Sequence, residues 1–307
     1  KSRRNLYQTG VLCYNTHKTR VFPTLRPPGR AAGRAGGNEG ISVKLSFQTA
    51  GLPTWPVLLV KTPVDAADRP AIAGKLKAIR ELGAKDVFFL TPPQGKGVVR
   101  VETVTGAVSG TALLLGGLSF AVGRGIRREK KLPVEIGGSD APCTVQLNPL
   151  AGHGAVDLPL PLWMGSRPFL SEAETAPMVC LPGLVCVLRS GEALPEEAVL
   201  APALDALARE NEVPAAAALL WNFRAGSLSA VRWQAGEANL TPLPCGVAAA
   251  GAAAAWSARH GTDGHHRLTI RQPGGALDTD AVVKGGRLQR LTVSGPVVLG
   301  PEYVVEF

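Results

Sequence analysis

Residues 239–260 read NLTPLPCGVAAAGAAAAWSARH, and they predict a turn followed by a buried helix. Pro242 and Pro244 favour the turn, and the alanine-rich run that follows it contains no helix breaker except Gly251. Cys245 therefore stands at the N-terminus of the predicted helix, where the helix dipole lowers the pKa of a thiol. This makes Cys245 a candidate catalytic thiol. The structural alternative is a small buried residue in front of a tightly packed helix.

A series of strands and turns follows this helix. Residues 267–272 and 276–278 flank a Pro-Gly-Gly turn, residues 291–296 end in Ser-Gly-Pro, and residues 303–307 are apolar. Over residues 239–307 this order resembles the C-terminal half of the diaminopimelate epimerase family, with its phenazine-biosynthesis and proline-racemase relatives. The resemblance implies an α+β fold of two similar halves, each a mixed or antiparallel sheet wrapped around a central helix.

The region before this stretch predicts a matching first half. In the family, a turn presents a first catalytic Cys-Gly in front of a helix. Here residues 105–111 read TGAVSGT and precede a predicted helix over 112–122. In one alignment with the family, Ser109 takes the place of the cysteine. In the other alignment Leu115 takes it, and a leucine is neither an acid nor a base. The other elements predicted for this half are a helix over 71–82 and strands over 43–47, 57–60, 87–90, 98–102, 134–136 and 144–147.

The second half opens after a segment rich in proline and glycine, residues 149–177, which we expect to carry the crossing between halves. An amphipathic helix is predicted over 196–211, with strands over 184–188, 216–223 and 228–233. We therefore expect three parts: an extended basic arm, residues 1–42; a first epimerase-like half, residues 43–165; and a second, residues 166–307.

The positive charge of the chain is concentrated in the arm. Residues 1–42 hold eight Lys and Arg residues against Glu39 alone, which makes +7 of the net charge of +9. The Pro/Gly/Arg segment 26–37 buries too little apolar area to order by itself, so we expect a partner to hold it. The partner is another protein subunit, or an anionic surface such as RNA or lipid headgroups. A leftover targeting sequence or a solvated tail is the alternative. The candidate partner-binding residues are Arg3, Arg4, Lys18, Arg20, Arg26, Arg30 and Arg34.

Composition and residue patterns argue against membrane-spanning, disulfide-rich, metal-binding and secreted proteins. No apolar run approaches the roughly 18 to 20 residues that a membrane-spanning helix needs. The five cysteines form no CxxC pair, so neither a disulfide framework nor a zinc site is indicated. The pair His265-His266 near Asp263 lies in a glycine-rich loop, and we expect it to be solvated rather than to bind a metal. No signal-peptide core is present, so we expect a protein that is not secreted, with a mitochondrial location first and a cytoplasmic one second.

Catalysis in the family, as the resemblance implies, uses two acid/base groups on opposite faces of an α-carbon and no cofactor. Cys245 and Ser109 are the candidates for this pair. A serine hydroxyl is a poor base at neutral pH and would need activation.

The positions that hold the substrate in the family differ in this chain. The Glu-Arg pair corresponds to Gln234-Ala235, and the Asn-x-Asn-Phe strand corresponds to residues 220–223, which keep one Asn. The Gly-Asn-Asp-Phe and Gly-Asn-Pro-His motifs correspond to residues 51–54 and 181–184, and the helix-capping Thr or Ser corresponds to Val247. A buried zwitterion needs charged or hydrogen-bonding partners, since each unmatched charge costs several kcal/mol. We expect a pocket filled with apolar groups.

Two functions follow from these observations. The first is a non-catalytic pseudoenzyme with an epimerase fold, a structural subunit of a large assembly such as a mitochondrial respiratory complex or ribosome, docked through its basic arm. The second is a cofactor-independent isomerase or racemase that uses Cys245 and Ser109. An open gap between these two residues favours the second function, and apolar packing between them favours the first.

Overall fold

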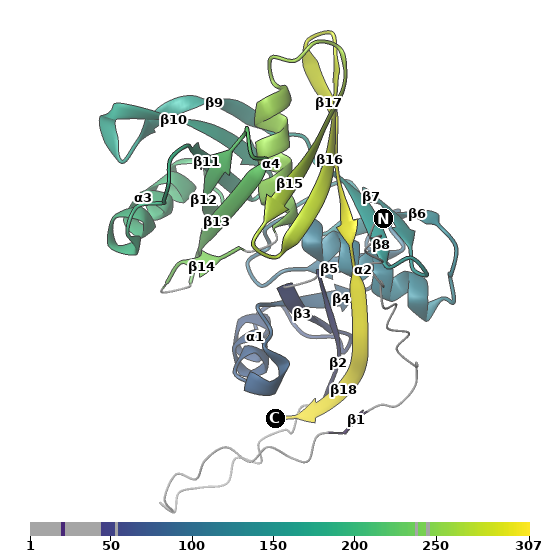
Figure 1. Ribbon diagram of the computed structural model, residues 1–307. Helices are drawn as coiled ribbons and strands as arrows, with labels where there is room; N and C mark the ends of the chain where they lie inside the picture. The colour runs from purple at the N-terminus through teal and green to yellow at the C-terminus, as the bar shows by residue number, and fades with distance from the viewer. Residues whose placement is uncertain (1–19, 22–43, 53–54, 237–238, 244–245) are drawn as a thin grey trace, which may run out of the picture.

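The computed structural model describes residues 20–21, 44–52, 55–236, 239–243 and 246–307. These residues form one continuous mixed sheet that bends around two central helices, α2 (Gly110–Gly123) and α4 (Val247–Ala258) (Figure 1). The predicted α+β fold with two similar halves, each a sheet around a central helix, is confirmed. Within the described residues, every helix is too short or too polar to cross a bilayer.

The first half surrounds α2. Its strands pair in chain order, parallel at β3–β4 and β5–β6 and antiparallel elsewhere. The strands are β2 (Lys44–Leu52), β3 (Trp55–Val60), β4 (Asp86–Thr91), β5 (Val99–Glu102), β6 (Lys130–Ile136), β7 (Cys143–Asn148) and β8 (His153–Leu158). The two parallel pairs need crossover connections. The first crossover contains α1 (Arg69–Lys77), and the second contains α2 itself.

The second half surrounds α4 in a similar way. Its strands are β9 (Trp163–Phe169), β10 (Ser171–Leu181), β11 (Leu184–Arg189), β12 (Ala215–Asn222), β13 (Ser227–Gln234), β14 (Thr241–Pro242), β15 (Gly264–Gln272), β16 (Gly275–Lys284) and β17 (Arg287–Pro296). Strands β11 and β12 are parallel, and α3 (Glu197–Glu210) forms the crossover between them.

Two strand pairings join the halves. Strand β17 pairs antiparallel with β8 of the first half. Strand β18 (Val298–Glu306) then returns to the first half and runs beside β2, as Figure 1 shows. At the other edge of β18, β1 (Arg20–Val21) pairs in parallel with Tyr303 and Val304. This short pairing is the part of the basic arm that the structure describes.

The two central helices owe their composition to burial on all sides. Both are apolar around their whole circumference, which is typical of a helix enclosed by other elements. A Cβ atom added at Gly116 of α2 would overlap Val101 of β5, and one added at Gly251 of α4 would overlap Leu158 of β8. Small residues are therefore needed where the sheet approaches each helix backbone. Buried side chains of both halves form one continuous core that includes the two helices.

Two elements differ from the sequence-based predictions. The helix predicted over 71–82 ends at Lys77 and is followed by a 3₁₀ turn (Arg80–Leu82), which Gly83 ends in a left-handed conformation with φ 56°. The segment 149–177 carries the crossing, but it also contains β8, β9 and the beginning of β10. Only Phe169 of β9 is buried, and the first five residues of β10 are exposed, so these sequences lack the apolar alternation that predicts a strand.

Candidate functional site

The site predicted from the sequence lies at the N-termini of α2 and α4. Ser109 is the N-cap of α2: its backbone is extended, and its Oγ accepts a hydrogen bond of 3.2 Å from the backbone N–H of Ala112. A capping serine satisfies a helix N–H group that otherwise has no partner. No base among the described residues is hydrogen-bonded to the Ser109 hydroxyl. Its geometry is that of a helix cap.

Gly246 is the N-cap of α4 and is held by a distant side chain. The Gly246 N–H donates a hydrogen bond of 2.7 Å to Oε1 of Gln272, and Nε2 of Gln272 donates one of 3.4 Å to the Gly246 carbonyl. Gln272 is only 8% exposed and ends β15. The glutamine therefore fixes the start of α4 against the sheet. Cys245, the residue before Gly246, lies outside the described residues.

The two helix N-termini are in contact through apolar atoms. A Cβ atom built on Gly110, the first residue of α2, would lie 2.5 Å from Cγ1 of Val247 and 2.8 Å from Cδ2 of Leu158. Val247 is the first residue of α4 and is 1% exposed. The side chain of Val247 thus occupies the space directly beside the N-terminus of α2.

The loop before α2 is covered by the turn between β10 and β11. A Cβ atom at Gly183, which has a φ of 78°, would lie 2.9 Å from the backbone nitrogen of Val108 and 3.1 Å from Cα of Ala107. Only a residue without a Cβ fits both this conformation and this contact. Apolar side chains from both halves are buried around these loops: Val108, Leu158, Leu181, Leu184, Leu243 and Val247. Thr111 and Gln272 are buried polar residues near the same helix N-termini, and Cys245 lies outside the described residues. The expected filling of the pocket with apolar groups therefore stays a prediction.

Comparisons with known proteins agree with this architecture. No protein-family model matches the chain, and no curated protein matches it. Solved structures do match: a predicted epimerase from Pseudomonas aeruginosa has a TM-score of 0.60 at 16% identity, covering 85% of this chain and 98% of the other. A phenazine biosynthesis protein of the PhzF family from Bacillus anthracis has a TM-score of 0.59 at 13% identity, covering 86% and 99%.

A third match is a hydroxyproline epimerase from Agrobacterium vitis with bound trans-4-hydroxy-L-proline. Its TM-score is 0.59 at 12% identity, and the match covers 86% of this chain and 93% of the other. The chain has the fold of these epimerase-like proteins. At such low identities the likeness establishes the fold alone.

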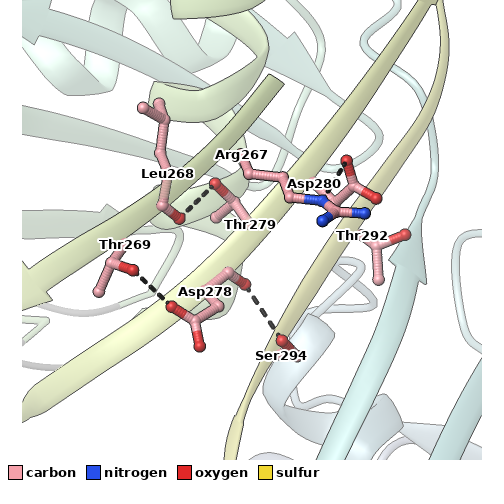
Figure 2. Close-up of a pocket in the computed structure, with 8 residues that line it drawn as sticks. All are labelled: Arg267, Leu268, Thr269, Asp278, Thr279, Asp280, Thr292 and Ser294. Atoms are coloured by element: carbon pink, nitrogen blue, oxygen red, sulfur yellow. Dashed lines mark hydrogen bonds and ion pairs between the residues drawn. The ribbon is translucent and has the colours of Figure 1, made fainter. Parts of the chain in front are cut away.

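A polar hollow of about 400 Å³ lies elsewhere in the epimerase-like fold, on β15, β16 and β17 (Figure 2). Asp280, one of its lining residues, lies 2.9 Å from Nδ1 of His265, 3.4 Å from Nη2 of Arg290 and 3.9 Å from Nε of Arg267. Asp278 accepts a hydrogen bond of 2.7 Å from the Thr269 hydroxyl. The charged side chains of this hollow thus have partners on neighbouring strands, as is usual on the exposed face of a sheet.

The prediction that the histidine pair lies in a loop is wrong, because His265 and His266 both belong to β15 and pair with β16. His265 pairs with Asp280, whereas Nε2 of His266 lies 2.8 Å from the carbonyl oxygen of Thr262. The Asp263 carboxylate accepts hydrogen bonds from the N–H groups of Gly285 and Gly286, and these bonds hold its pKa below the usual range. In the part of the chain that the structure describes, no three His, Cys, Asp or Glu side chains are arranged to hold a metal ion.

A buried carboxylate that the sequence analysis missed stabilises the loop between β4 and β5. Glu135 of β6 accepts hydrogen bonds of 2.7 to 2.8 Å from the backbone N–H groups of Gln94, Gly97 and Gly95. These bonds hold the pKa of Glu135 below its usual range, with a further contribution from Arg100. Glu135 stands in an ordinary strand pattern, and its partners lie about 40 residues earlier in the chain. The local sequence therefore carries no signal for this interaction.

The remaining sequence-based candidates fall outside what the structure describes. Among the seven arm residues proposed to bind a partner, the backbone of Arg20 is described in β1. The other six, Arg3, Arg4, Lys18, Arg26, Arg30 and Arg34, lie outside the described residues. The pairing of Cys245 with Ser109 and the contacts of the arm therefore stay predictions.

Proposed function

We propose that this chain is a non-catalytic protein with an epimerase-like fold, an accessory subunit of a large mitochondrial assembly that docks through its basic arm. The observation that carries the first part of the proposal is the contact between Val247 and Gly110. The charge of +7 on residues 1–42 supports the second part, since the remainder of the chain is nearly neutral.

An amino acid or imino acid substrate needs partners for its charged groups when it is buried. The ligand of the hydroxyproline epimerase from Agrobacterium vitis, trans-4-hydroxy-L-proline, is an imino acid. Burial of an amine and a carboxylate without partners costs several kcal/mol per charge. At the helix N-termini of this chain, the buried groups include the apolar Val108, Leu158 and Val247 and the uncharged polar Thr111 and Gln272. Ser109, the candidate second acid/base group, serves as a helix cap.

The proposed absence of catalysis is tested by hydrogen exchange at the α-carbon of candidate substrates. The purified chain is incubated in D₂O with proline, trans-4-hydroxy-L-proline and diaminopimelate, and the α-proton signal is followed by NMR. We expect no loss of this signal above a protein-free control. Exchange that disappears in both Cys245→Ser and Ser109→Ala would contradict the proposal and establish the isomerase alternative.

The structural part is tested by the size of the particle that contains the chain. A tagged full-length chain is expressed in cells, and mitochondrial extracts are separated by sucrose-gradient sedimentation. We expect the chain to sediment far ahead of its free form. Replacement of the seven candidate partner-binding residues of the arm by glutamine is expected to return the chain to the position of its free form.

A matched control removes positive charge from the globular part. Arg127, Arg128, Lys130 and Lys131 are exposed, and their replacement by glutamine is expected to leave sedimentation unchanged. Sedimentation of the unaltered chain as a free protein, or its absence from mitochondria, would show that the docking part of the proposal is wrong. The exchange experiment does not depend on this result.

A further inference from the structure

A second hollow, of about 390 Å³, lies far from the helix N-termini. It opens where β11 and β12 end, beside Trp256 near the C-terminus of α4. Trp256 stands nine positions after Val247 in α4, which corresponds to about 14 Å along a helix. We call it the aromatic hollow, because its lining includes Trp221, Phe223 and Trp256. It is distinct from the site that the sequence predicted.

The position of the aromatic hollow in the sheet favours ligand binding. Strands β11 and β12 are parallel and end side by side, with Arg189 opposite Leu220. The loops that follow them contribute Ser190, Gly191, Phe223 and Arg224 to the lining. Ligands of α/β proteins commonly bind outside the carboxyl ends of parallel strands, because the loops that leave these ends can separate and form a crevice.

The aromatic side chains offer flat apolar surfaces to a ligand. Phe223 is 62% exposed, and its ring meets the buried ring of Trp221 edge to face, with 6.3 Å between the ring centroids. The guanidinium carbon of Arg259 lies 3.3 Å from the ring centroid of Trp256, so this ring is held in place by a cation–π contact. Exposed aromatic rings beside arginines are typical of surfaces on which a planar ring stacks.

The lining also carries positive charge that is incompletely paired. Nη2 of Arg189 lies 2.6 Å from Oε1 of Glu174. The other terminal nitrogen of Arg189, Nη1, is buried and has no hydrogen-bond partner among the described residues. Arg224 adds a second, exposed guanidinium to the lining.

We propose that the aromatic hollow binds a small ligand in which a flat ring carries an anionic group, as in a mononucleotide or an aromatic carboxylate. The ring stacks on Phe223 or Trp256, and the anion lies between Arg189 and Arg224. The volume is at the lower end of the range for small-molecule sites, about 300 to 1,000 Å³, and suits one ring system with one anionic group. This inference goes beyond the proposed function and does not depend on it.

The test is a titration of the purified full-length chain with two probes, AMP and salicylate, followed by tryptophan fluorescence and calorimetry. We expect saturable binding of at least one probe. We expect its affinity to fall about tenfold or more when the anion or the ring is removed, as in adenosine and ribose 5-phosphate for AMP, or phenol and acetate for salicylate. Which of the two probes binds more tightly distinguishes a nucleotide ligand from a carboxylate ligand.

Two exposed residues of the aromatic hollow can be changed with little risk to the fold. Phe223→Ala and Arg224→Gln are each expected to weaken binding about fivefold or more. The matched controls are Leu162→Ala, at an exposed apolar residue outside the hollow, and Arg80→Gln, at an exposed arginine of the first half. The proposal is overturned if neither probe binds at millimolar concentration, or if Phe223→Ala and Arg224→Gln bind as well as the controls.

Discussion

Gly110 and Val247 bring the N-termini of the two central helices into contact: a Cβ atom on Gly110 would lie 2.5 Å from Cγ1 of Val247. Distances below about 3.0 Å are too short for two carbon atoms that are not bonded, so the two residues must be considered together. The absence of a side chain at Gly110 makes room for the side chain of Val247. This contact lies beside Ser109, the residue before Gly110 and the candidate acid/base group of the first half.

The first prediction concerns this contact. Gly110→Ala is expected to lower the free energy of unfolding by ~1 to 3 kcal/mol, because the added methyl group overlaps Val247. Val247→Ala is expected to cost a similar amount through lost burial. The double variant is expected to lose less free energy of unfolding than the two single variants lose together, because alanine at position 247 leaves room for the new methyl group at position 110. Urea denaturation, followed by circular dichroism, gives the free energy of unfolding of the unaltered chain, the two single variants and the double variant.

Strict additivity in this double-mutant cycle would contradict the contact. It would mean that Val247 and Gly110 do not interact directly in solution.

The second prediction concerns the glycines inside the central helices. Gly116→Ala and Gly251→Ala are each expected to destabilise the protein by ~1 to 3 kcal/mol, because the new methyl groups overlap Val101 and Leu158. The matched control is Gly74→Ala in α1, where nothing lies within 4 Å of the added Cβ. Here we expect stabilisation by ~0.5 to 1 kcal/mol, since alanine favours a helix over glycine. Thermal unfolding of the three variants tests the prediction, and equal effects at all three sites would contradict it.

The sequence predicts those parts of the fold whose signals are local. The helix α4 was predicted because its alanine-rich run contains no breaker except Gly251, and α2 because an apolar run follows the turn over 105–111. The helix α3 was predicted because leucines recur on one face of it. The sequence also predicts apolar groups around Ser109, since residues such as Val247 stand where the resembled family has polar groups. Val247 is indeed buried, and the expected filling of the whole pocket stays a prediction.

Other features depend on contacts between distant parts of the chain. Gln272 holds Gly246 across 26 residues, and Glu135 binds a loop about 40 residues earlier. Neither residue stands in a distinctive local pattern. The aromatic hollow likewise combines residues that follow β12, such as Phe223, with Trp256 of α4. The register of the sheet and the packing of α4 against it bring these residues together, and neither is specified by the residues that surround each of them in the sequence.

The third prediction concerns pH and Glu135. The three backbone N–H groups of Gln94, Gly97 and Gly95 stabilise the ionised carboxylate and lower its pKa in the folded protein. The stability from this carboxylate is therefore present above the unfolded-state pKa, about 4.3, and is lost as the pH falls through the folded-state pKa. Glu135→Gln is expected to destabilise the protein at pH 7, and the difference from the unaltered chain is expected to shrink below about pH 4.

The measurement is urea denaturation of both proteins between pH 3 and pH 7. The matched control is Glu81→Gln, at an exposed glutamate in the 3₁₀ turn, for which we expect a small effect that is similar at every pH. A difference between Glu135→Gln and the unaltered chain that grows toward low pH would contradict the role of the carboxylate.

The fourth prediction concerns the thiols. Cys143, Cys180 and Cys186 are buried and form no disulfide. Burial raises the pKa of Cys143 to about 11 and also raises the pKa values of Cys180 and Cys186 above the ordinary value of a thiol. Because the thiolate is the reactive form, these three thiols are expected not to react with Ellman's reagent at pH 8 until the protein is unfolded. The variant Cys13→Ser/Cys245→Ser isolates them for the measurement.

The same variants report on Cys245. Cys13→Ser differs from Cys13→Ser/Cys245→Ser by the Cys245 thiol alone, so the difference between their labelling rates is the reactivity of Cys245. A thiol at the N-terminus of α4 that served as a catalytic base would react rapidly near neutral pH, because the helix dipole favours its thiolate. The non-catalytic proposal predicts slow labelling, as for the three buried thiols. Rapid labelling of Cys245 that falls on acidification would instead support the isomerase alternative.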